Sequence, residues 1–74
     1  MERTRLHVTP FAEGWRVTTD DGRRVSELFL DRTDAVRRAE GLARIEGEAT
    51  VIVHGRGDLY GYRHEFRSET NGRG

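Results

Sequence analysis

The stretch DRTDAVRRAEGLARIEG, residues 31–47, decides the fold of this 74-residue chain. Its apolar residues recur at helical spacing: Ala35, Val36, Ala39, Leu42 and Ala43. They occupy one side of a helical wheel, while arginines and glutamates occupy the other. Asp31 is an N-cap residue, Asp34 can reach back to that cap, and Gly47 suits the C-terminal position of positive φ. We therefore predict one amphipathic helix. Its apolar stripe is too narrow to stabilise the helix without a sheet beneath it.

Two segments before this helix alternate polar and apolar residues, which is typical of half-buried strands. In residues 5–9, Leu6 and Val8 face one way; in residues 15–19, Trp15 and Val17 do the same. We expect these strands to form a hairpin whose pairing stops at Pro10, since proline lacks an N–H. A turn at residues 20–22, Asp-Asp-Gly, then predicts a third strand over residues 24–30.

Two further strands are expected after the helix. Residues 49–53 are a continuous apolar run rich in β-branched side chains, which favours a central position in a sheet. Residues 55–58 predict a turn, and residues 59–66 alternate as an outer strand should. The predicted order is β-β-β-α-β-β, an α+β fold with a small antiparallel-rich sheet and one helix packed on one face. We expect a flexible start at residues 1–4, a single domain at 5–66 and a disordered tail at 67–74.

The apolar run also predicts how the sheet is covered. Ile52 should point away from Val51 and Val53, so both faces of the central strand would carry apolar groups. One helix covers only one face, and an exposed apolar face calls for a partner. A second copy of the chain is the simplest cover, so we expect a homodimer, with a different partner protein as the other possibility.

Charge and composition narrow the functional classes. All 13 basic residues are arginines, they balance 13 acidic residues, and they are spread evenly along the chain. This pattern disfavours a basic nucleic-acid-binding tail, although folding could still gather arginines on one face. Cysteine is absent, which fits a reducing compartment, and no apolar run is long enough to cross a membrane. We expect a cytoplasmic protein without a membrane partner.

No catalytic, metal or cofactor site is predicted. His7, His54 and His64 lack helical or short-loop ligand spacing, although His7 and His54 could lie side by side on adjacent strands. The glycines at positions 55, 57 and 61 miss the spacing of a dinucleotide-binding loop, and a strand follows them. The two serines, at positions 26 and 68, lie in no nucleophile motif. We therefore expect neither an enzyme nor a bound cofactor.

The aromatic residues leave two functions open. Trp15 alternates with Val17 and is expected in the core, while Tyr60 and Tyr62 fit either an interface or ordinary edge packing. The main hypothesis is a small non-catalytic protein-interaction or accessory module that self-associates. The alternative is a nucleic-acid-binding domain with arginines and tyrosines on the open sheet face, where tyrosines could stack on bases. The candidate interface residues are Ile52, Tyr60, Tyr62, His7, His54 and Arg16.

Several short segments, taken in order, resemble a known family. They are His7-Val8-Thr9-Pro10, Gly14-Trp15-Arg16-Val17, Ser26 and Phe29 ahead of Asp31, the three alanines of the helix, and Val53-His54-Gly55. Over roughly residues 7–62 the chain resembles the family called domain of unknown function 2188. That family usually has Ser or Thr at the position of Asp31, and often Asp-Gly where this chain has Gly57-Asp58. The resemblance implies a small α+β fold and implies no activity.

Overall fold

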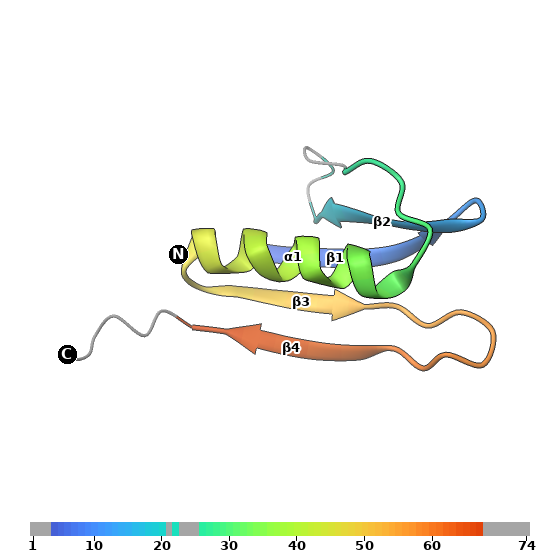
Figure 1. Cartoon of the computed structure of the whole chain (residues 1–74). Helices are drawn as coiled ribbons and strands as arrows, with labels where there is room; N and C mark the ends of the chain where they lie inside the picture. The colour runs from blue at the N-terminus through green and yellow to red at the C-terminus, as the bar shows by residue number, and fades with distance from the viewer. Residues whose placement is uncertain (1–3, 21, 23–25, 68–74) are drawn as a thin grey trace.

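One helix lies against one face of a four-stranded mixed sheet (Figure 1). The structure is a computed structural model that describes residues 4–20, 22 and 26–67. The elements are β1 (Thr4–Phe11), β2 (Gly14–Thr19), α1 (Arg32–Glu46), β3 (Ala49–Val53) and β4 (Tyr62–Phe66). The strand order is β2-β1-β3-β4, with β1 and β3 parallel and both outer pairs antiparallel. The predicted α+β class is confirmed, and β3 lies inside the sheet as expected.

Helix α1 has the predicted position and apolar side. Asp31 is the N-cap residue with an extended backbone, and Gly47 ends the helix with a φ of 91°. The Asp31 side chain itself makes no capping hydrogen bond. Ala35, Ala39 and Ala43 are fully buried, since their short side chains let the helix lie close to the sheet. Val36 and Leu42 flank this alanine column and pack at the rim of the core.

The core lies between α1 and the three strands β1, β2 and β3. Each strand contributes residues of one parity, which are Leu6 and Val8, Trp15 and Val17, and Ala49, Val51 and Val53. The register aligns Val17, Val8 and Val53 across the sheet, so their side chains share the helix-covered face. Trp15 is only 4% exposed, which confirms its predicted place in the core.

The expected third strand is wrong for residues 26–30, and residues 23–25 lie outside the described part of the chain. Residues 26–30 lie along the outer edge of β2 and hydrogen-bond to it. Among them, only Phe29 forms a β-bridge, and its partner is Trp15. Ser26 bonds to Val17 and Phe29 bonds to Trp15. Ser26 and Phe29 are three residues apart, whereas their partners Val17 and Trp15 are two residues apart. The extra residue prevents a regular ladder of backbone hydrogen bonds. Among the described residues, the sheet therefore has four strands and not the predicted five.

Two predicted strand boundaries also change. Pairing continues past Pro10 to Phe11, because Pro10 faces Trp15, whose backbone groups turn outward to Phe29 and need no N–H from proline. The last strand begins at Tyr62 rather than residue 59, because Arg56 and Leu59 close a tight turn by exchanging backbone hydrogen bonds of 3.0 and 2.9 Å. Gly57 takes the first central position with a φ of 59°, as in type II′ turns. The predicted tail lies almost wholly outside the described residues.

The expectation of an apolar uncovered face is wrong. Ile52 does point away from the helix, but the strand residues that share its face are otherwise polar or charged up to Phe11 at the end of β1. They are Arg5, His7, Thr9, Arg16, Thr18, Thr50, Arg63 and Glu65. Ile52 alone does not make the face apolar, because its neighbours on the adjacent strands, His7 and Arg63, are polar or charged. The second face therefore does not require a cover.

A glycine substitution tests the edge contact of β2. A Cβ built at Gly14 would lie 2.2 Å from the carbonyl oxygen of Phe29, whereas one built at Gly41 meets nothing within 4 Å. We predict that Gly14→Ala lowers the free energy of unfolding by about 2–3 kcal/mol, because the backbones must separate. The matched control Gly41→Ala should raise it by up to about 1 kcal/mol, since alanine favours a helix. Urea denaturation measures both, and equal shifts would contradict the tight contact.

Candidate interaction surfaces

A chain of polar side chains crosses the uncovered face of the sheet near its centre. The Nε2 atom of His7 lies 2.5 Å from Oδ1 of Asp20, and Nη1 of Arg5 donates to Oδ2 of the same carboxylate at 3.1 Å. Nδ1 of His7 lies 3.1 Å from Nε2 of His54, and the two rings stack with centroids 5.3 Å apart. The possible adjacency of His7 and His54 is therefore confirmed. The Asp20 carboxylate is held by side chains and does not simply face water as a turn residue would.

The geometry leaves two arrangements for the proton between the two histidines. A carboxylate only accepts, so Nε2 of His7 donates to Asp20. Either His54 then donates to Nδ1 of a neutral His7, or a doubly protonated His7 donates to a neutral His54. Among the described residues, no group of three or more His, Asp or Glu side chains is placed to hold a metal ion. His64 lies on the opposite face, in register with Val51.

The arginines predicted for nucleic-acid contact share the uncovered face. Arg5 and Arg63 belong to the same parity set as His7 and Ile52, and Arg16 faces Thr9 across the β1–β2 ladder. The guanidinium of Arg16 lies 4.0 Å from the centroid of Phe11, and its Nε atom is buried without a hydrogen-bond partner. Asp20 and Glu65 place negative charge on the same face, so it carries both signs.

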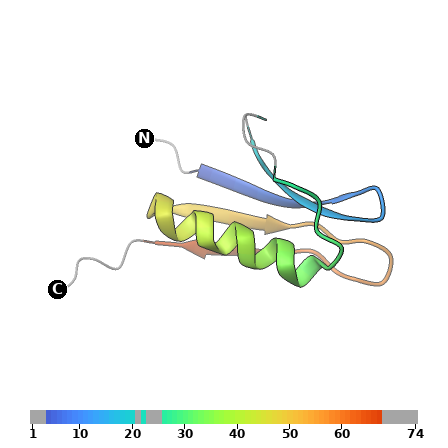
Figure 2. The same ribbon diagram turned by 45° about the horizontal axis from the view of Figure 1, so that its top comes forward.

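Two arginines hold one end of the molecule together around Trp15. Arg32, at the start of α1, donates to the carbonyl oxygens of His54 and Tyr60, at 3.3 and 2.8 Å. Arg56 donates to the carbonyls of Ala12 and Gly14. Each guanidinium lies 5.5 Å from the Trp15 ring, within cation–π range. The two loops, residues 12–13 and 54–61, therefore meet at the end where α1 begins (Figure 2).

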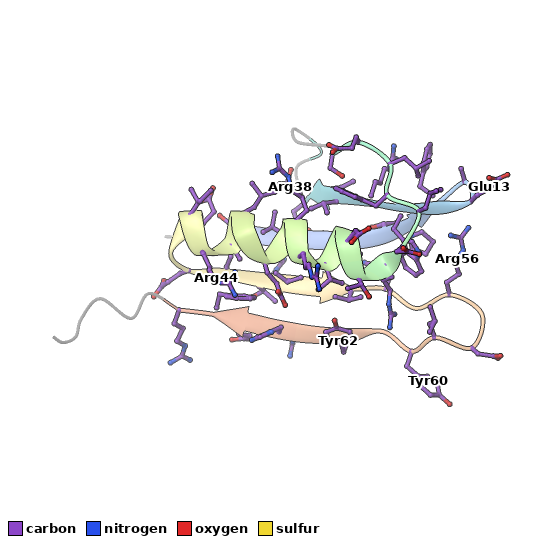
Figure 3. The ribbon with its side chains drawn as sticks, viewed as in Figure 1. Glu13, Arg38, Arg44, Arg56, Tyr60 and Tyr62 are labelled. Atoms are coloured by element: carbon purple, nitrogen blue, oxygen red, sulfur yellow. The ribbon has the colours of Figure 1, made fainter. Side chains whose placement is uncertain are left out.

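Strand β4 lies at the edge of the sheet, where the helix covers it only in part. Four of its five residues are exposed, and Phe66 is partly buried. A groove of about 290 Å³ lies beside β4, lined by Arg32, Thr33, Val36, Arg37, Glu40 and Tyr62. Arginines span the gap from the helix, with Arg44 5.8 Å from the Phe66 ring and Arg32 5.8 Å from the Tyr62 ring. Figure 3 shows Arg44 and Tyr62 on this side of the molecule, with β4 as the lower edge of the sheet.

The six candidate interface residues are not brought together. Four lie on or beside the uncovered face: His7, His54, Arg16 and Ile52. Tyr62 lies on the opposite face, in register with Val53, and Tyr60 projects from the β3–β4 connection with 88% of its surface exposed (Figure 3). Sequence reasoning missed the loop contacts of Arg32 and Arg56, because no local pattern reports a hydrogen bond across more than twenty residues. It also missed that Arg63 and Glu65 share one face of β4, although their opposite charges two positions apart were visible in the sequence.

Together these features define a small α+β domain with a mixed-charge open face and an exposed edge strand. The family model described as an uncharacterized protein conserved in bacteria, DUF2188, matches residues 6–65. The chain belongs to this family, which confirms the resemblance seen in its short segments. No curated protein and no solved structure matches the chain. In the described part of the chain, no helix is long and apolar enough to cross a membrane.

The Asp20 contacts predict a pH dependence of stability. The hydrogen bond from His7, helped by Arg5, holds the pKa of the Asp20 carboxyl below its usual value of 3.8. The unfolded chain therefore takes up this proton more readily, so the contribution is present above about pH 4 and is lost as pH falls through the folded-state pKa. We predict that the stability difference between wild type and Asp20→Asn shrinks as pH falls from 6 to 2.

Urea unfolding across this pH range measures the difference. Glu13→Gln removes the same charge at the exposed tip of the β1–β2 hairpin and is the matched control. A gap between wild type and Asp20→Asn that stays constant with pH would contradict the ionic role of Asp20.

Proposed function

We propose that this domain is a small non-catalytic protein-interaction module that self-associates. The observation that carries the proposal is the exposure of β4, a regular strand whose side chains are left largely uncovered by α1. An edge strand presents unpaired N–H and C=O groups, which are a template for adding another strand. A cytoplasmic location belongs to the same proposal, because a small core without cysteine suits a reducing compartment.

The alternative, nucleic-acid binding, keeps one specific support. Arg5, Arg16 and Arg63 share one face, as a basic platform requires. Two observations weigh against it: the face also carries Asp20 and Glu65, and Tyr62 lies on the other face and cannot stack on a base bound there. Protein interaction is therefore the better-supported function.

Sedimentation tests self-association directly. We predict that the weight-average mass rises with concentration from 8.5 kDa toward twice that value. One short strand pair buries less than a standard interface, so the association should be weak and clearly concentration-dependent. A mass that stays at the monomer value up to about 1 mM, where even a dissociation constant of that size would show, would rule out self-association.

A retardation assay with a single-stranded oligonucleotide tests the alternative. If the arginine face binds the strand, log K should fall with log salt with a slope of about −2 for three phosphate contacts, and Arg16→Ala should weaken binding. Arg38→Ala, an exposed change on α1, is the control. We predict no retarded band at physiological salt. A salt-sensitive band lost in Arg16→Ala would favour the alternative.

A further inference from the structure

The two edges of the sheet differ in how their backbone groups are satisfied. At the β2 edge, Trp15 exchanges backbone hydrogen bonds of 2.7 and 2.8 Å with Phe29. The carbonyl of Val17 accepts from the N–H of Ser26 at 2.9 Å, and its N–H donates to Oγ of Ser26 at 2.8 Å. The β2 edge is therefore closed by the chain itself. Among the described residues, none hydrogen-bonds to the outer side of β4.

The ladder geometry shows which β4 groups face outward. The carbonyl of Val8 accepts from His54 N–H at 2.9 Å, so the even-numbered residues of β3 turn their backbone groups toward β1. Val51 and Val53 must then turn theirs toward β4, where they face His64 and Tyr62. Those two β4 residues bond inward. The backbone N–H and C=O groups of Arg63 and Glu65 therefore point out of the free edge.

The side chains of these outward-bonding residues are self-complementary. Arg63 and Glu65 lie on the uncovered face, carry opposite charges, and form no ion pair with another described residue. The strand sequence Tyr-Arg-His-Glu-Phe is symmetric in character about His64, with an aromatic residue at each end. An antiparallel copy centred on His64 would place each arginine opposite a glutamate. It would also place Tyr62 of one copy opposite Phe66 of the other.

We propose that two copies of the chain join by antiparallel pairing of their β4 strands in this register, which makes one continuous sheet across the dimer. The proposal rests on the proposed self-association and adds its surface and register. The neighbouring registers that keep outward groups facing each other are worse. One places Arg63 opposite its own copy, and the other places Glu65 opposite its own copy, so like charges meet.

Charge reversal tests the register. Arg63→Glu creates Glu opposite Glu, and Glu65→Arg creates Arg opposite Arg, so each single variant should dimerise about tenfold more weakly than wild type. The double variant Arg63→Glu/Glu65→Arg should regain dimerisation. An equimolar mixture of the two single variants should form a heterodimer. Arg38→Glu makes the same charge change at an exposed position of α1 and should leave the dimer unchanged.

A unique thiol gives an independent readout. The chain has no cysteine, and His64→Cys would place two thiols at the two-fold axis in a non-hydrogen-bonded pair. The Cα separation of such a pair, about 4.5 Å, lies within the range that a disulfide spans. Under mild oxidation His64→Cys should form a covalent dimer rapidly and nearly completely. Arg38→Cys should cross-link only slowly, by collision.

The outcomes separate this inference from the proposed function. Charge rescue together with rapid His64→Cys cross-linking supports the β4 pair. A dimer in sedimentation that ignores the charge reversals and does not cross-link through position 64 overturns the β4 pair while self-association stands. A monomer at every concentration, with no cross-linking, overturns both. All substituted positions are exposed, and circular dichroism confirms that each variant is folded.

Discussion

The close approach of an alanine-lined helix to the sheet is the constraint from which the rest of the structure follows. Ala35, Ala39 and Ala43 are all fully buried, so α1 lies close against the sheet. A helix with so narrow an apolar stripe covers few strands, and here it packs on β1, β2 and β3. Strand β4 is left outside that cover. The long side chains of Arg32 and Arg44 reach across to its aromatic rings.

Local patterns predicted the parts of the fold that depend on periodicity. The helix boundaries, the hairpin of β1 and β2, the internal place of β3 and the burial of Trp15 all follow from side-chain spacing and end signals. The turn at residues 20–22 predicted a third strand after it, but residues 26–30 do not form one. Residues 26–30 instead form an irregular segment that hydrogen-bonds to the edge of β2, and Leu30 in it is 73% exposed. Alternation alone could not reveal that three of its positions match two of β2.

The candidate site was harder to predict because it depends on strand order. Sequence spacing suggested that His7 and His54 could be neighbours, but Asp20 joins them only because the β1–β2 hairpin returns it beside His7. The polar character of the uncovered face likewise follows from the register, which aligns Ile52 with His7 and Arg63. The prediction of an apolar face rested on Ile52 alone, a single β-branched residue in the central strand. The charges on its neighbours were visible in the sequence, but their shared face was not.

The contrast between the two sheet edges links the fold to the proposed function. Closing the β2 edge uses the segment that leads into α1, and that segment is needed anyway to cross from β2 to the helix. In the described part of the chain, by contrast, no residue hydrogen-bonds to the outer side of β4. Proteins usually block an exposed edge with charged side chains, a proline, a bulge or a very short strand. Here the outward-bonding positions hold one cation and one anion in a regular strand. The proposed register would therefore pair opposite charges, whereas the two neighbouring registers would pair like charges.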